Sequence, residues 1–281
     1  MKPFLLTLFS LVAFALNSIL CRMALRTDEI DAASFTAVRL VSGAIALYVL
    51  LLATRKTQNP AKTGRWVSAF LLFAYAVCFS FAYIGLSAGT GALILFGSVQ
   101  LTMIVVALAK GERPSLFEWA GLSAAIGGLV YLTLPGLDSP PVAGSLLMAA
   151  AGSAWGLYTL RGRSTADPLA LTAGNFFMAV PFAAMTIMWF WSGLHLSVRG
   201  TILAVLSGAV ASGVGYTVWY AALRYHTSTR AAVLQLAVPV LAALGGVLLM
   251  DEAATARLAI ASALILGGIA VAIAGRKKRP A

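Results

Sequence analysis

The chain carries an internal repeat, because its two halves correspond when the sequence is shifted by 139 residues. This shift aligns Arg22 with Arg161, and one further residue of shift aligns Glu112 with Glu252. Each half holds five strongly apolar stretches. Because five is odd, the second half must enter a membrane from the side opposite to the first. Inverted repeats of this kind recur in secondary transporters, whose substrate site lies near the midplane between the repeats.

Apolar stretches account for nearly the whole chain. Apolar residues make up 60% of the sequence and charged residues only 10%, which excludes a soluble globular protein. Each stretch approaches the roughly 20 residues that cross a bilayer. The sequence predicts an all-α integral membrane protein with ten transmembrane helices, arranged as two inverted five-helix repeats around a central cavity. The expected repeats are 1–135 and 142–275, followed by a basic tail at 276–281. The expected spans are 3–21, 33–53, 66–86, 91–109, 116–134, 142–160, 169–191, 201–223, 231–249 and 257–274.

The first stretch has a second interpretation. Lys2 and the apolar run that follows it are also typical of a cleaved signal peptide. The repeat requires a helix here as the counterpart of 142–160, so we expect it to be the first span.

The net charge of +11 is distributed unevenly between the two sides of the predicted membrane protein. Of the 20 Lys and Arg residues, fifteen fall in the segments on the side of the chain ends and four on the other side, with Arg39 inside a span (15 + 4 + 1 = 20). This positive-inside bias predicts a multi-pass protein of the bacterial inner membrane with both termini in the cytoplasm. The basic tail then contacts lipid headgroups, and no nucleic-acid partner is expected.

A family resemblance is carried by residues 222–273, ALRYHTSTRAAVLQLAVPVLAALGGVLLMDEAATARLAIASALILGGIAVAI. The small-residue helix start, the proline within a helix, the acidic helix end and the Gly-Gly final helix resemble the EamA repeat of the drug/metabolite transporter superfamily. Residues 83–132 match the same pattern more loosely. The branch that the chain resembles most is that of the aromatic amino-acid exporters. The resemblance implies ten helices in two inverted repeats, a central cavity, and a fifth and a tenth helix that lie outside it.

The acidic residues are missing from the middle of every predicted span, since all nine lie in loops or at helix ends. A proton-coupled exporter of cationic drugs usually needs a carboxylate within the membrane. We therefore expect facilitated diffusion of a net-neutral solute without obligatory ion coupling. No metal site, cofactor or catalytic constellation is expected, and no enzymatic activity. The predicted function is export of aromatic and other apolar or neutral amino acids by alternating access. Export of hydrophobic or cationic drugs, or of other small metabolites, is the alternative.

Aromatic side chains mark two corresponding spans and suit a path for amino acids, because they combine apolar walls with polar tips. They equally suit helix packing or an interfacial belt. The candidates are Tyr75, Phe79 and Tyr83 in one half and Tyr216, Trp219 and Tyr220 in the other, together with Trp155 and Tyr158.

Uncharged amides and one arginine within spans form the polar part of the predicted site. Each amide is a candidate to orient the polar end of a substrate, or else joins helices by hydrogen bonds. Arg39 could extend to the outer interface, face the cavity and attract a carboxylate, or pack against carbonyl groups. The candidate amides are Asn17, Gln100, Asn175 and Gln235.

Proline and glycine residues suggest where helices bend and where they pack closely. Pro181 and Pro239 each remove a backbone donor from a predicted helix, which marks either a hinge or a fixed kink. Glycines at 121, 127, 128, 267 and 268 permit close packing within the chain or between copies in a homo-oligomer.

Overall fold

The computed structural model describes residues 2–54, 63–109, 111, 115–134, 139–162, 165–226 and 234–274. Within these ranges the regular secondary structure is helical, apart from one isolated antiparallel bridge between Ile30 and Leu196. The first half contains α1 (Lys2–Arg26), α2 (Ala32–Ala53), α4 (Trp66–Tyr83), α5 (Ala88–Ala109) and α6 (Leu116–Thr133). The second half contains α7 (Val142–Gly162), α8 (Pro168–Trp189), a 3₁₀ turn η1 (Trp191–Gly193), α9 (Val198–Val205), η2 (Leu206–Val214), α10 (Gly215–Leu223), α12 (Ala237–Met250) and α13 (Ala256–Ala274).

Several helices begin at side chains that satisfy the free N–H groups of the first turn. Asp31, Asp167 and Ser197 accept hydrogen bonds from backbone N–H groups at the starts of α2, α8 and α9. Ser115 and Glu118 form a capping box at the start of α6. These polar residues end the loops and set where the apolar helices start.

Seven helices of the described chain are long and apolar enough to cross a membrane: α1, α2, α4, α5, α6, α8, and the continuous helix Val198–Leu223 formed by α9, η2 and α10. Residues 237–250 and 256–272 form shorter apolar helices. The remaining helix, α7, has 21 residues but is not among the seven. It packs against α4 and α5 and places glycines at the contact, where a Cβ on Gly152 would lie 2.5 Å from the Leu95 carbonyl oxygen. The protein is therefore a multi-pass, all-α membrane protein, as the sequence predicts.

The predicted spans coincide with these helices to within about three residues at most ends, and the end of α1 and the start of α12 differ by more. Helix α1 extends to Arg26 rather than ending at residue 21, because Arg22 and Arg26 bind neighbouring segments instead of entering a loop. The span predicted at 231–249 overlaps α12, but residues 227–233 lie outside the described ranges. The tail predicted at 276–281 also lies outside them.

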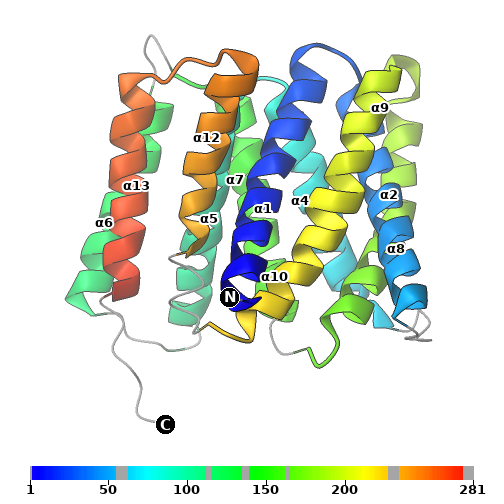
Figure 1. Ribbon diagram of the computed structural model, residues 1–281. Helices are drawn as coiled ribbons and strands as arrows, with labels where there is room; N and C mark the ends of the chain where they lie inside the picture. The colour runs from blue at the N-terminus through cyan, green and yellow to red at the C-terminus, as the bar shows by residue number, and fades with distance from the viewer. Residues whose placement is uncertain are drawn as a thin grey trace.

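Successive spans alternate in direction, so α1 and α7 run in opposite directions. Helix α1 starts and α13 ends at the same side of the bundle (Figure 1). We call this side the terminal face and the other the opposite face. Helices α6 and α13 lie side by side at one edge of the bundle (Figure 1), and the pocket described below is lined by other helices. This arrangement confirms the expectation that the fifth and tenth helices lie outside the cavity.

Candidate functional site

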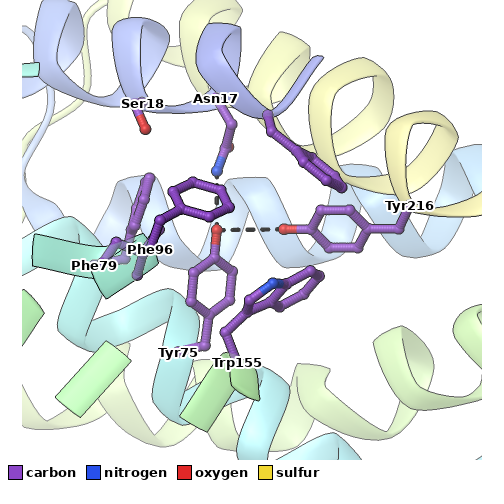
Figure 2. Close-up of a pocket in the computed structure, with 9 residues that line it drawn as sticks. Asn17, Ser18, Tyr75, Phe79, Phe96, Trp155 and Tyr216 are labelled. Atoms are coloured by element: carbon purple, nitrogen blue, oxygen red, sulfur yellow. Dashed lines mark hydrogen bonds between the residues drawn. The ribbon is translucent and has the colours of Figure 1, made fainter. Parts of the chain in front are cut away.

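A small pocket lies in the middle of the bundle, between the two halves of the chain (Figure 2). Its room is close to that of one water molecule. The first half contributes side chains from α1, α4 and α5, and the second half contributes one residue each from α7 and α10. The lining residues are Phe14, Asn17, Ser18, Tyr75, Phe79, Leu95, Phe96, Trp155 and Tyr216. Five of them, Asn17, Tyr75, Phe79, Trp155 and Tyr216, are among the residues that the sequence suggests.

The hydroxyl group of Tyr75 is the centre of the polar contacts in this pocket. It accepts a hydrogen bond of 3.0 Å from Asn17 Nδ2 and lies 3.4 Å from the Tyr216 hydroxyl (Figure 2). The Asn17 carbonyl oxygen accepts from Ser207 at 2.6 Å and from Ser212 at 3.5 Å. One network therefore joins α1, α4, η2 and α10 across the boundary between the halves.

Arg39 belongs to the same network and does not reach the interface, since only 1% of the residue is exposed. Its NH2 group donates to the hydroxyls of Tyr75 at 3.0 Å and Tyr216 at 3.1 Å. Its Nε donates to Ser212 Oγ at 3.2 Å. The guanidinium lies over the rings of Tyr75 and Phe79, 5.0 and 4.9 Å from their centroids, in cation–π geometry. The interpretation that Arg39 extends to the outer interface is therefore wrong.

Aromatic rings form most of the pocket wall and contact one another closely. The Trp155 ring lies 4.5 Å from that of Tyr216 and 5.0 Å from that of Tyr75, measured between centroids. Phe14 packs edge-on against Trp155 and Trp219. Such arrangements are the favoured ones for aromatic pairs, so the wall is well packed as well as apolar.

The other candidate substrate-binding residues are buried but lie outside the lining of this pocket. Tyr158 stacks on Trp155 and accepts a hydrogen bond of 3.4 Å from Asn175. Asn175 also accepts from the backbone N–H of Arg65, so it joins α8 to the start of α4. Tyr83 contacts Phe79 edge-on, with ring centroids 4.7 Å apart.

The remaining candidates lie on α5, α8, α10 and α12, and just before α12. Tyr220 lies beside Gly162. Gln100 is buried in α5, and Gln235 is buried just before α12. Pro181 lies inside α8. Pro239 lies in the first turn of α12 (Ala237–Met250), where a proline interrupts no hydrogen bond within that helix.

The segment η2 is a stretch of π-helix that the sequence does not reveal. Its glycines let it pack directly on α2, since a Cβ on Gly208 would collide with the carbonyl group of Arg39. The wider turn places both Ser207 and Ser212 against Asn17. π-Helical turns within α-helices are frequent at functional sites. The only sequence signal is the run of small residues SGAVASG at 207–213.

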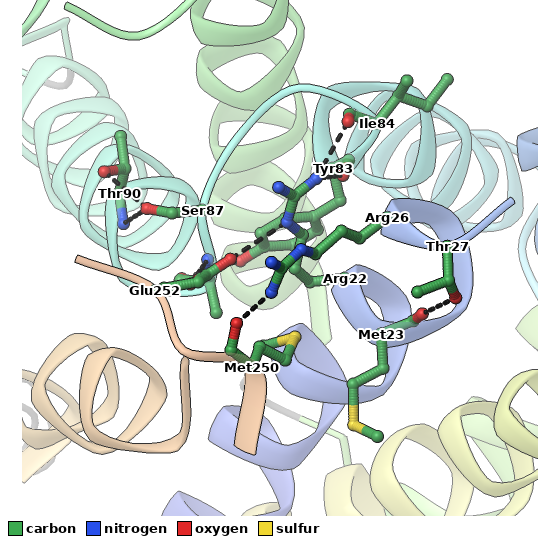
Figure 3. A network of polar contacts seen from close by, with 11 residues as sticks. Arg22, Met23, Arg26, Thr27, Tyr83, Ile84, Ser87, Thr90, Met250 and Glu252 are labelled. Carbon is green, nitrogen blue, oxygen red and sulfur yellow. Dashed lines mark hydrogen bonds and ion pairs between the residues drawn. The ribbon is translucent and has the colours of Figure 1, made fainter. Parts of the chain in front are cut away.

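A second polar network joins segments of the two halves at the opposite face, and Figure 3 shows its contacts. Arg22 forms an ion pair of 3.0 Å with Glu252 and donates to the carbonyl oxygens of Tyr83 and Ile84. The other carboxylate oxygen of Glu252 accepts from the backbone N–H of Ala88 at 2.8 Å. We call this group the Arg22–Glu252 network. It joins α1 and the α4–α5 loop of the first half to the α12–α13 loop of the second.

Two loops of the opposite face are also joined, one from each half. The Asp31 carboxylate caps α2 by accepting from Ser34 N–H at 2.8 Å and accepts from the backbone N–H of His195 at 2.9 Å. Burial alone would raise the pKa of Asp31, but these hydrogen bonds and the nearby His195 outweigh burial and lower it below its ordinary value. The ionised carboxylate therefore stabilises this contact.

Within the described ranges, no group of three or more His, Cys, Asp or Glu residues lies close enough to hold a metal ion.

Comparison with known proteins places this geometry in a family. The sequence model of the EamA-like transporter family matches residues 1–134 and again residues 142–274. A solved crystal structure superposes with a TM-score of 0.64 at 23% sequence identity, covering 95% of this chain and 97% of the other, which supports the fold alone.

Two relatives span most of the chain. An uncharacterised protein of Pseudomonas aeruginosa is 51% identical over 100% of this chain and 97% of its own length. A protein of Escherichia coli K12 named "probable amino-acid metabolite efflux pump" is 28% identical over 75% of this chain and 79% of its own. With two matches that together cover nearly all of the sequence, the chain belongs to the EamA-like transporter family.

Proposed function

We propose that the protein exports aromatic and other apolar or neutral amino acids across the bacterial inner membrane by alternating access. The family supports transport in general. The relatives from Escherichia coli and Salmonella typhimurium, both named as probable amino-acid metabolite efflux pumps, support amino acids as the cargo. The positive-inside bias of the sequence supports cytoplasmic termini, so the terminal face would be the cytoplasmic one.

The observation that carries this proposal is the chemistry of the pocket between the halves. Aromatic rings of Phe14, Phe79, Phe96 and Trp155 offer a wall for an apolar side chain. The donors of Asn17 and Arg39, which bind the Tyr75 hydroxyl in this structure, would meet the polar end of a substrate once the helices separate. A neutral amino acid combines these two chemistries within one small molecule.

The distribution of acids supports movement without obligatory ion coupling. In the part of the chain that the structure describes, Asp and Glu lie at helix ends or in loops, at positions 28, 29, 31, 118, 167, 251 and 252. A proton or sodium ion carried through the membrane usually binds a carboxylate within it. The amino-acid gradient itself would then drive transport.

Transport through this pocket requires the helices to move apart, because room for about one water molecule cannot hold an amino acid. The Arg22–Glu252 network and the Asp31–His195 contact join the halves on the opposite face. Opening of that side would break these contacts, and Pro181 within α8 is a candidate hinge.

The proposal is tested by export from bacterial cells loaded with a phenylalanine dipeptide, with the appearance of external phenylalanine measured over time. Cells that express the protein should export faster than cells with an empty vector. Trp155→Ala should lower export severalfold and Trp155→Phe should retain most of it, with protein levels in the membrane equal by immunoblot. Trp189→Ala is the matched control, since Trp189 is 83% exposed at the end of α8. Equal export with and without the protein would refute the proposal.

A further inference from the structure

Among the residues that the structure describes, the buried charge of Arg39 has no counter-ion. Its guanidinium forms hydrogen bonds with Tyr75, Tyr216 and Ser212, which are all neutral groups. The ion pairs of the described chain involve Arg22, His195 and Arg199 rather than Arg39. A buried cation is costly unless an anion or a metal site pairs with it. The centre of the bundle therefore carries a positive charge that an incoming anionic group would neutralise.

Hydrogen-bond donors outnumber acceptors around this charge. Arginine has five N–H donors, and three of them are used, one by Ser212 and one by each tyrosine, which leaves two on NH1 (5 − 3 = 2). NH1 is buried and has no hydrogen-bond partner within the described ranges. A carboxylate accepts hydrogen bonds and donates none, so it matches both the charge and this excess of donors.

Acceptors for an ammonium group are scarce in the same place. The Asn17 carbonyl oxygen already accepts from Ser207 and Ser212. The Tyr75 hydroxyl accepts from both Arg39 and Asn17. A positively charged group here would also be repelled by Arg39, because like charges interact strongly in a medium of low dielectric constant.

We propose that the pocket recognises the carboxylate of its substrate through Arg39 and requires no ammonium group, so that its ligand class is apolar or aromatic monocarboxylates. Neutral amino acids are members of this class, and the inference rests on the proposed function in that respect. The rings of Phe14, Phe79, Phe96 and Trp155 hold the apolar body. As the helices separate, the carboxylate reaches the guanidinium that lies behind the hydroxyls of Tyr75 and Tyr216.

The test is calorimetric titration of the purified protein in detergent with two probes that divide phenylalanine into its parts. The first probe, 3-phenylpropanoate, keeps the ring and the carboxylate, and the second, phenethylamine, keeps the ring and the ammonium group. We expect 3-phenylpropanoate to bind at least as tightly as phenylalanine, and phenethylamine to bind at least roughly tenfold more weakly. Equal or tighter binding of phenethylamine, or no binding of 3-phenylpropanoate, would overturn the inference.

Variants then attribute the binding to Arg39. Arg39→Met should weaken 3-phenylpropanoate binding by roughly 10- to 100-fold, the loss of a charge-assisted hydrogen-bonded pair. Arg39→Lys should restore part of this affinity, because it keeps the charge without the planar fork. Arg199→Met removes the same side chain from the exposed opposite face and should bind like the wild type. Unchanged affinity in a folded Arg39→Met variant, with folding judged by size-exclusion elution, would overturn the role of Arg39. The probe series uses the unmodified protein and decides the question even if that variant does not fold.

Failure of this inference and failure of the proposed function give different results. If cells export phenylalanine but 3-phenylpropanoate does not bind, the function stands and carboxylate recognition is refuted. If 3-phenylpropanoate binds through Arg39 but phenylalanine is not exported, carboxylate recognition stands and amino-acid export is refuted.

Discussion

In the centre of the bundle, neutral side chains stabilise a buried charge, the guanidinium group of Arg39. Arg39 is stabilised by hydroxyl groups and aromatic faces from α4 and from the continuous helix that contains η2 and α10. Each of these contacts is modest on its own, and together they replace the hydration that the guanidinium loses. The contacts of Tyr75 matter most, because its hydroxyl is shared by Arg39, Asn17 and Tyr216.

Tyr75→Phe tests the structural weight of that hydroxyl. The substitution leaves N–H groups of Arg39 and Asn17 without an acceptor, so we expect a loss of stability of about 1–3 kcal/mol and a lower apparent melting temperature in detergent. Tyr48→Phe is the control, because Tyr48 is half exposed on the outside of α2. Equal melting temperatures for both variants would mean that the Tyr75 hydroxyl does not support the network.

The lowered pKa of Asp31 predicts that the stability of the protein depends on pH. Because its folded-state pKa is lowered below the ordinary value of 3.8, its contribution is complete above that value and is lost as the pH falls through the folded-state pKa. Asp31→Asn keeps a side chain that can cap α2 but removes the charge. We expect the wild type to melt at a higher temperature than Asp31→Asn at pH 7, and the difference to shrink as the pH falls below 3.8 and through the lowered folded-state pKa. A difference that does not change with pH would show that the charge of Asp31 does not stabilise the loops.

Whole helices are joined in two different ways, by close packing at the edge of the bundle and by polar contacts on its opposite face. Gly121 and Gly268 lie in direct contact between α6 and α13, where a Cβ on Gly268 would be 2.6 Å from the Gly121 carbonyl oxygen. The Arg22–Glu252 network instead joins elements that the proposed alternating access would separate. The first contact is expected to be permanent and the second reversible.

Gly268→Ala and Gly267→Ala form a matched pair for the first contact. A methyl group at Gly268 collides with α6, whereas nothing lies within 4 Å of a Cβ at Gly267. Overpacking costs about 1–3 kcal/mol, and alanine favours a helix over glycine by about 1 kcal/mol. We therefore expect Gly268→Ala to lower the melting temperature and Gly267→Ala to leave it unchanged or raise it. The reverse order would contradict the close approach of α6 and α13.

Glu252→Gln removes the ion pair of the Arg22–Glu252 network. The native thiol of Cys21 reports the effect, because Cys21 is fully buried next to Arg22. Without the ion pair the opposite face should open more often, so Cys21 should react severalfold faster with a maleimide in a Cys78→Ala background, as measured by mass spectrometry.

Asp251→Asn is the control for this experiment. It removes a neighbouring exposed charge, and asparagine tolerates the left-handed conformation found there. Equal Cys21 reaction rates in the wild type, Glu252→Gln and Asp251→Asn would show that the Arg22–Glu252 network does not control access from this side.

For the whole molecule, the fold could be predicted from the sequence to a greater extent than the site. Apolar length decides where a helix crosses a membrane, so stretches such as 33–53 and 116–134 predict α2 and α6 to within a residue or two. The repeat predicts that α7 runs opposite to α1. Helix α7, which packs on α4 and α5, coincides with the apolar stretch predicted at 142–160 to within two residues.

The site is formed by contacts between residues that lie far apart in the sequence, and the pattern of residues within one span does not show these contacts. Asn17 could be selected because an amide within a span is unusual, and Tyr75 and Trp155 could be selected because their side chains combine an apolar wall with a polar tip. Phe14 and Phe96 could not, since a phenylalanine that lines a pocket looks like one that faces lipid. The position of Arg39 stayed open for the same reason. Its burial is settled by the approach of η2 to α2, which depends on a π-helical segment that no sequence motif announces.

The most direct test of the whole account is counterflow of radiolabelled phenylalanine by the purified protein in liposomes, with equal pH on both sides and no sodium gradient. Liposomes loaded with unlabelled phenylalanine should accumulate the label transiently, well above protein-free liposomes, because the account requires an amino-acid carrier that needs no coupled ion. Accumulation that occurs only after a proton or sodium gradient is imposed would contradict uncoupled transport. No accumulation under any of these conditions would contradict amino-acid transport itself.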